Sequence, residues 1–304
     1  MNKNEKEIIQ KRLETEKKVL KKLEREYSAA LRQINEKIKL LQSDVLTQSK
    51  IYRIQYQKAL KAQVEAILEK LHADEYSTIQ QFLSDSYSDG FIGTVYSFHN
   101  QDVPLILPID KKAAVQAVQT DSKIKGSLYE ALGIDVDAMK RSIQQEITRG
   151  ISSGLSYDDI ARNLWNATKA PLANLKRIVR TEGHRIQETS ADDARREAKK
   201  KGADVVKQWD ATLDSVTRPT HQQLDGQIRE TDEYFEVGGK KAQYPGAFGD
   251  PAEDCNCRCV ALTRARMALN EDELEELKER AKRFGLDKTK DFEDFKRKYL
   301  NATN

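Results

Sequence analysis

The chain has 304 residues, 38% of them hydrophobic and 33% charged, and its 52 basic and 49 acidic residues leave a net charge of +3. Such a high but balanced charge content suits long solvated helices and excludes a chain kept unfolded by self-repulsion. No run approaches the roughly 18–20 apolar residues of a membrane span, so we expect no membrane contact. The three cysteines lie within residues 255–259, which excludes a disulfide framework and suits synthesis in the cytoplasm.

Residues 1–83 are predicted to form a helical, coiled-coil-like arm. Apolar residues recur every seventh position at Leu13, Leu20, Tyr27, Ile34 and Leu41. Residues 1–70 hold 17 Lys and Arg against 10 Asp and Glu, a net charge of +7, which leaves −4 for the rest of the chain. The interleaved acids favour a packing or oligomerisation arm over a strip dedicated to binding nucleic acid.

Residues 84–144 are predicted to form a junction and a helical middle region. Residues 84–90 are rich in Ser, Asp and Gly, residues 91–98 carry β-branched and aromatic residues, and residues 103–108 form a short apolar run with prolines at both ends. This pattern is typical of a turn followed by a small hairpin. Helices are expected over residues 110–120 and 134–149.

Residues 145–265 are predicted to form a compact α+β domain with a small antiparallel sheet. A helix should begin at Pro171 and stop at Gly202, because proline suits the first helical turn and glycine suits the residue after the last. Strands are expected over residues 204–212, 227–230, 234–237 and 258–263, with C-terminal helices over 266–304. The predicted fold class is therefore α+β, with a long helical arm in front of the domain.

Glu182 lies in the apolar stripe of the helix from Pro171, seven residues from Leu175 and four from both Ile178 and Ile186. A buried carboxylate must be paired or hydrogen-bonded, or its pKa rises. Glu182 is therefore either a site carboxylate, such as a general base, or one half of a structural ion pair.

A polar loop follows the first predicted strand. The strand carries Asp210, the loop carries Asp214, Arg218 and His221, and Asp225 opens a tight turn into the next strand. Polar residues at this density could form a binding site, or they could satisfy the backbone of an irregular loop.

Cys257 and Cys259 would point to the same side of a strand, where His221 could join them as a third zinc ligand. The usual zinc spacing is two separated Cys-x-x-Cys pairs, and only one histidine lies near in sequence. We therefore expect no cofactor and keep a structural zinc as the secondary interpretation, beside buried cysteines that act as small apolar residues.

Five segments together resemble the Mu F-like minor head (head morphogenesis) domain of tailed bacteriophages. They are Arg180-Thr181-Glu182, Trp209 to Asp214, Thr217-Arg218-Pro219 with His221, Leu224-Asp225-Gly226, and Asn256-Cys257-Arg258-Cys259. The ordered set spans roughly residues 145–262. The resemblance implies a shared motif made of Arg180, Glu182, Asp210, Asp214, Arg218, His221, Asp225, Cys257 and Cys259, without a catalytic role for any of them.

The resemblance also implies a virion protein rather than a metabolic enzyme. Such proteins enter the head in few copies through the portal protein and act in head morphogenesis and in DNA packaging and ejection. The expected location is the inside of the head, after assembly in the host cytoplasm, and the expected partners are the portal protein and the capsid or scaffold interior.

Double-stranded DNA is a further possible partner. The basic end of the long helix supplies the candidates for phosphate contact, namely Arg195, Arg196, Lys199, Lys200 and Lys201. The same cations would also stabilise a helix C-terminus electrostatically, whether or not DNA is bound.

The alternative function is an injected effector enzyme, nuclease-like or transferase-like, built on Glu182, Arg218 and His221. This hypothesis requires the three side chains to converge around an open cleft.

Overall fold

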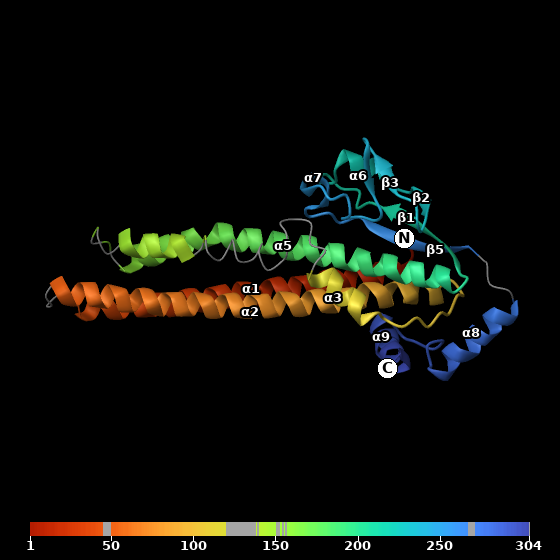
Figure 1. Ribbon diagram of the computed structural model, residues 1–304, viewed down its shortest axis with the longest axis horizontal. Coiled ribbons are helices and arrows are strands. Elements are labelled where there is room, and N and C mark those ends of the chain that lie inside the picture. Colours follow the sequence, from red (N-terminus) through yellow and green to blue (C-terminus); the bar gives the residue numbers. More distant parts are fainter. Residues whose placement is uncertain are drawn as a thin grey trace. The chain divides into compact units, whose positions relative to one another are not determined.

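A computed structural model describes residues 1–44, 50–119, 138, 140–149, 153, 155, 157–266 and 271–303. The long helices are α1 (Lys3–Asp44), α2 (Lys50–His99) and α5 (Tyr157–Lys200), shown with the other elements in Figure 1. The shorter helices are α3 (Lys111–Gln119), α6 (Pro219–Leu224), α7 (Pro251–Asp254), α8 (Glu271–Arg283) and α9 (Phe292–Thr303). The strands are β1 (Asp204–Asp210), β2 (Ile228–Glu230), β3 (Phe235–Val237), β4 (Lys240–Ala242) and β5 (Val260–Arg266).

The chain divides into two compact units. Unit 1 comprises residues 1–16, 82–124 and 180–304, and unit 2 comprises residues 17–81 and 125–179. Helices α1, α2 and α5 therefore contribute residues to both units. The linear domain boundaries drawn from the sequence stay a prediction.

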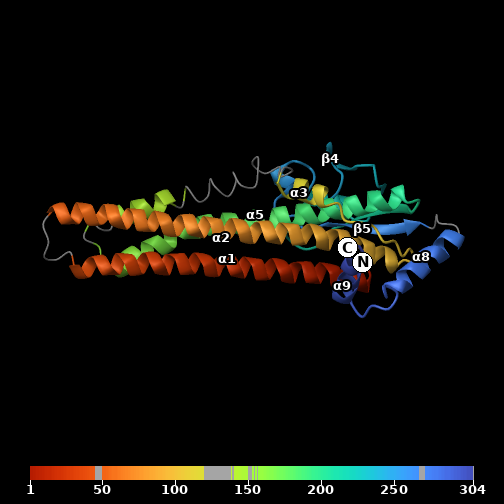
Figure 2. The same cartoon turned by 60° about the horizontal axis from the view of Figure 1, so that its bottom comes forward.

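Within unit 2, α1 and α2 run side by side, as Figures 1 and 2 show. Leu20, Tyr27 and Ile34, which belong to the seven-residue repeat, are buried. Lys22 on α1 donates a hydrogen bond of 2.8 Å to the Thr78 hydroxyl on α2. The predicted helical arm is confirmed, since its apolar stripe packs helix against helix and leaves most of the charges outside, with Glu75 buried between the helices as an exception.

Unit 1 contains two small antiparallel sheets. In the first, β1 is the central strand between β2 and β5, with Trp209 opposite Ala261. In the second, β3 pairs with β4 and Phe235 lies opposite Ala242. The predicted α+β class is confirmed, with small antiparallel sheets after the long helices and further helices at the C-terminal end.

Two apolar clusters form the core of unit 1. In the larger one, aromatic residues of α2 pack against α9, including Tyr96, whose ring centroid lies 4.9 Å from that of Phe295. The backbone N–H of Leu107 donates a 2.9 Å hydrogen bond to the Tyr299 hydroxyl, which fixes α9 against the segment after α2. The smaller cluster consists of Trp209, Ala211, Leu224, Phe235, Val237, Cys257 and Cys259.

The predicted turn and hairpin after residue 84 are wrong, because α2 continues to His99. A Cβ atom on Gly90 would lie 2.5 Å from the Gln187 carbonyl oxygen on α5 and 2.2 Å from the Ser190 hydroxyl. Glycine therefore permits close helix packing here rather than a turn. Tertiary contact overrides the weak local helix propensity of this segment.

Pro171 was expected to begin a helix, but it lies inside α5, which begins at Tyr157. The predicted end is confirmed: Gly202 has φ +87°, and the Ala203 N–H donates to the Ala198 carbonyl at 3.1 Å. Strand β4 was not predicted, because its three residues follow the Gly238–Gly239 turn within a glycine-rich connector.

Helix α3 agrees with the helix predicted over residues 110–120, and residues 140–149 are helical within the predicted span 134–149. Residues 120–137 lie outside the described part of the chain. Among the described residues, no helix combines the length and the apolar character needed to cross a bilayer.

Candidate functional site

Glu182 is buried on α5 and pairs with a cation one turn later. Its Oε2 accepts a 2.9 Å hydrogen bond from Arg185 Nε, and Arg185 also donates to the Ala117 carbonyl at 2.8 Å. Arg180 is half-exposed and forms a 3.2 Å ion pair with Glu16. Of the two interpretations of Glu182, these contacts favour the structural ion pair.

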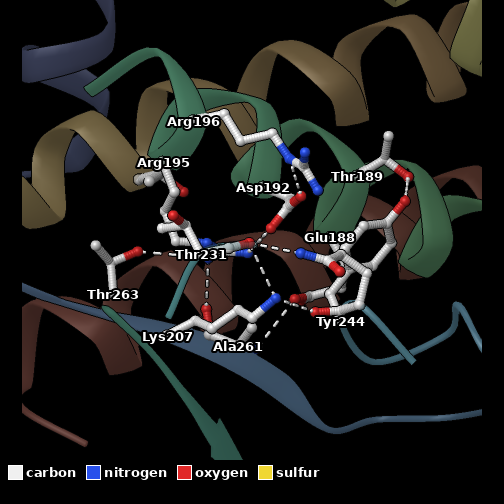
Figure 3. A network of polar contacts seen from close by, with 12 residues as sticks. Glu188, Thr189, Asp192, Arg195, Arg196, Lys207, Thr231, Tyr244, Ala261 and Thr263 are labelled. Carbon is white, nitrogen blue, oxygen red and sulfur yellow. Dashed lines mark hydrogen bonds and ion pairs between the residues drawn. The ribbon is translucent and has the colours of Figure 1, made fainter. Parts of the chain in front are cut away.

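A buried polar network continues along α5, and sequence reasoning missed it (Figure 3). Glu188 accepts a 3.0 Å hydrogen bond from the Ala261 N–H on β5, and fully buried Arg195 donates to the Ala261 carbonyl at 3.0 Å. Asp192 accepts from Arg196 at 2.7 Å. The charges of α5 thus bind the edge of β5, which joins the helix to the sheet.

Lys207 belongs to the same network, although it lies in the middle of β1. Its ammonium group is buried and donates to the carbonyls of Thr231 at 3.1 Å and Gln243 at 2.8 Å. Desolvation lowers the Lys207 pKa to about 8. The only sequence signal for this role was a lysine at an inward-facing position of a predicted strand.

The polar loop after β1 is held by its own side chains. The Asp225 carboxylate accepts from the Ala211 N–H at 2.8 Å, and Arg218 donates to the Cys255 carbonyl at 2.7 Å. Asp214 forms two hydrogen bonds with Arg258, of 2.6 and 2.7 Å, which hold the pKa of that carboxyl well below its usual range. Much of the loop motif therefore satisfies the backbone or forms a surface ion pair.

Asp210 occupies the last position of β1, opposite Val260. Its pKa is raised, mainly by desolvation. The main-chain bonds around it close the loop, since the Gly226 N–H donates to the Trp209 carbonyl at 2.8 Å.

His221, Cys257 and Cys259 converge in the smaller apolar cluster, and all three are buried. His221 Nδ1 lies 3.3 Å from Cys259 Sγ and 3.6 Å from Cys257 Sγ. Cys255 lies apart from the three, is half-buried, and is absent from the ligand group they form among the described residues.

The pKa values of the two thiols are shifted in opposite directions. The adjacent Cys257 thiol and then the His221 and Trp209 rings lower the Cys259 pKa to about 5, although burial acts in the opposite direction. The pKa of Cys257 is raised, first by its hydrogen bond to Cys259 and then by burial. Two sulfurs and an imidazole nitrogen at these distances form a donor set for a soft metal ion.

Glu182, Arg218 and His221 do not form one polar centre among the described contacts. Glu182 binds Arg185, Arg218 binds a carbonyl, and His221 faces the two cysteines and Glu253. Each of the three side chains therefore binds a different set of partners.

The basic end of α5 is only partly exposed. Arg195 is fully buried, whereas Arg196, Lys199, Lys200 and Lys201 are exposed. Lys199 pairs with Asp232 at 3.1 Å and Lys200 with Glu197 at 2.5 Å. The surface that could meet a phosphate therefore excludes Arg195.

Residues 141–262 match the family described as Phage Mu protein F like protein. The chain carries a phage Mu F-like domain. This match contains the whole of α5, the three-stranded sheet up to Leu262, and every residue of the motif expected from the sequence. The Mu F-like domain thus includes both the buried α5 network and the Cys–His cluster.

Two curated relatives share a longer region with the chain. Minor head protein GP7 of Bacillus phage SPP1 is a distant homologue, 27% identical over 211 residues that cover 67% of this chain and 67% of GP7. NAD(+)–arginine ADP-ribosyltransferase EFV of Enterococcus faecalis is 29% identical over 243 residues, 78% of this chain. The match spans about half, 49%, of the transferase. No solved structure matches the chain significantly.

Proposed function

We propose that the protein is a minor head protein of a tailed phage. It would enter the head in few copies through the portal protein and act in head morphogenesis and in DNA packaging and ejection. The observation that carries this proposal is the Mu F-like match over residues 141–262, together with the distant homology to GP7 over 211 residues. The capsid interior and the portal are the partners that follow from it.

The contact with the head proteins is assigned to the loop after β1, which carries exposed apolar side chains beside the motif. Leu213 and Val216 are 64% and 74% exposed, and between them Asp214 accepts a 3.1 Å hydrogen bond from the Val216 N–H. A loop with hydrogen bonds of its own supports docking, because less conformational entropy is lost on binding.

The test is co-expression of the full chain with the portal and major capsid proteins of a tailed phage, followed by purification of assembled heads. The wild-type chain should co-purify in substoichiometric amounts, and L213S/V216S should reduce its incorporation at least about tenfold. Val115→Ser, at a position 53% exposed on α3, is the matched control and should incorporate normally. Absence of the intact wild-type chain from the heads would overturn the proposal.

We further propose, as part of the same function, that the protein contacts double-stranded DNA, and this contact is tested separately. Exposed Lys199, Lys200 and Lys201 would meet phosphates, so the triple alanine variant should bind duplex DNA more weakly and with a lower salt dependence. A variant whose salt dependence equals that of the wild type would exclude this end of α5 as the contact.

An effector enzyme is the second candidate function, favoured by the similarity to an ADP-ribosyltransferase. The shared region is also similar to a minor head protein, so this similarity alone does not require transferase chemistry. We therefore propose that this chain is not an enzyme. Release of nicotinamide from NAD+ by the purified protein, abolished in a Glu182→Gln variant, would reverse that conclusion.

A further inference from the structure

The His221–Cys257–Cys259 cluster has no part in the proposed docking of the protein. His221 comes from α6, and the two cysteines come from the segment that leads into β5. Their ligand atoms all lie within 4.8 Å of one another, and the side chains are 1%, 5% and 2% exposed. Three ligand atoms have therefore been brought together from separate elements into a buried position.

The spacing of these atoms fits a tetrahedral ion. With Zn–S and Zn–N bonds of about 2.3 and 2.05 Å, a tetrahedral angle places a sulfur and a nitrogen ligand about 3.6 Å apart. The distances from His221 Nδ1 to the two sulfurs are 3.6 and 3.3 Å. Both nitrogen–sulfur distances therefore lie within a few tenths of an ångström of the tetrahedral value.

The orientation of the imidazole also fits a metal ligand. While Nδ1 faces the sulfurs, Nε2 lies 3.3 Å from Glu253 Oε2, although the angle between them does not yet make a hydrogen bond. Glu253 is held in turn by Lys240 at 2.8 Å and by the Thr220 hydroxyl at 2.9 Å. Metal-binding histidines typically direct their other ring nitrogen to such a carboxylate, which fixes the ring and its tautomer.

The surroundings favour a soft cation with few ligands. The Trp209 and Phe248 rings lie against the His221 ring, each with its centroid 5.7 Å away, and Phe235 packs against Trp209. A bare divalent ion would be costly in such an apolar shell, but two thiolates neutralise its charge. Sulfur and imidazole ligands in a dry pocket select zinc over magnesium or calcium.

We propose that His221 Nδ1 and the sulfurs of Cys257 and Cys259 bind one zinc ion. Binding releases the thiol protons to solvent and involves no change of oxidation state. Zinc here ties α6 to the start of β5, and Glu253 is a positioning residue that acts through His221. Three protein ligands leave one tetrahedral position, which a single bound water or hydroxide would fill.

The test uses the full chain purified under reducing conditions without a metal-affinity tag. Elemental analysis should find one zinc per chain, and Co²⁺ substitution should give the sulfur-to-cobalt charge-transfer band of a two-thiolate site. Cys255→Ser is the matched control, because it removes a neighbouring cysteine outside the cluster, and it should retain both signals. Cys257→Ser and Cys259→Ser should lose them.

Chelation of the wild-type protein covers the case in which the cysteine variants do not fold. The chelated protein should melt at a lower temperature and become open to alkylation at Cys257 and Cys259, and added zinc should reverse both effects. Glu253→Gln should keep the stoichiometry but weaken zinc affinity by about 10–100-fold.

Three outcomes would overturn the zinc site. The first is a folded, metal-free wild type that does not bind added zinc at micromolar concentration. The second is loss of zinc in Cys255→Ser. The third is rapid alkylation of Cys259 that zinc does not slow, which would indicate a nucleophilic Cys259–His221 pair instead. None of these outcomes bears on incorporation into heads, so this inference and the proposed function fail separately.

Discussion

Two polar regions of unit 1 border strand β5 and differ in what their buried atoms bind. Along α5, Glu188 and Arg195 hydrogen-bond to the two main-chain groups of Ala261. In the cluster before β5, the ligand atoms of His221, Cys257 and Cys259 face one another. Burial is the same in both regions, so the partners of the buried atoms, rather than burial itself, separate a structural network from a ligand site.

The largest effect is expected from breaking the α5 network at Arg195. Arg195→Ala removes the donor to Ala261 and leaves buried Asp192 with one cationic partner fewer, so it should lower the free energy of unfolding by about 3–5 kcal/mol. Urea denaturation followed by circular dichroism measures this change.

Arg196→Ala is the control for that variant, since Arg196 pairs with the same carboxylate but is 47% exposed. It should cost less than Arg195→Ala, because only one partner of the Arg196–Asp192 pair is buried. Equal losses in the two variants would show that the network does not depend on burial.

The second prediction concerns the pH dependence of Lys207. Its pKa falls from 10.5 to about 8 on folding, so between these values the unfolded chain holds a proton that the folded protein has released. Stability therefore rises with pH across this window, by at most about 3 kcal/mol. The free energy of unfolding from urea titrations at pH 7.5 to 10.5 measures the rise.

Lys207→Met isolates this contribution from the tyrosines and cysteines that titrate in the same range. The variant should lack the part of the rise that comes from Lys207. A wild type and a variant with parallel stability profiles would contradict the assignment.

The third prediction tests the support of the Cys–His cluster. His184 Nε2 lies 2.8 Å from the Cys259 carbonyl, and burial lowers the His184 pKa to about 3, so the neutral ring donates this hydrogen bond. A Cβ on Gly246, where φ is +84°, would lie 2.9 Å from His184 Nδ1. Gly246→Ala should therefore lower stability by about 1–3 kcal/mol more than backbone strain alone.

Gly226→Ala supplies the strain-only reference, because φ is +77° there and nothing lies within 4 Å of the added methyl group. It should cost about 1–2 kcal/mol. Thermal melting of the two variants compares them directly, and equal losses would mean that His184 moves aside without cost.

The smallest effect is expected at the exposed Asp214–Arg258 pair. Asp214→Asn keeps the shape of the side chain and removes its charge, and solvent and salt already screen that charge. The melting temperature should stay within experimental error of the wild type. A large drop would show that exposed and buried polar groups contribute alike here.

The sequence predicted those parts of the fold in which local pattern and tertiary packing agree. Along the second half of β1, buried residues alternate with half-buried ones, as the sequence pattern predicts. Gly202 lies just after the end of α5 and allows the hydrogen bonds of a glycine C-cap. Gly90 and Pro171 misled the prediction, because both are signals of local breaks that also occur inside helices. At Gly90 the deciding fact is the close approach of α5, which no local pattern contains.

The sequence predicted which residues belong to the candidate site, but not which of them lie next to one another. Nothing in the spacing of His221 and Cys259 shows that α6 turns its histidine toward the cysteines, since 38 residues separate them. That placement depends on the packing of Trp209, Phe235 and Phe248 around the ring. Glu182 was likewise predicted to be buried, but its partner Arg185 could only be identified from the structure.

Unit 1 combines residues from both ends of the chain, which determines when it can fold during synthesis. The Phe292 N–H on α9 donates a 2.7 Å hydrogen bond to Glu7 on α1, across 285 residues of chain. The first turns of α1 leave the ribosome early, yet their partners are among the last residues to be made. Unit 1 therefore completes its packing only after α9 has been translated, because its long-range contacts join the two ends of the chain.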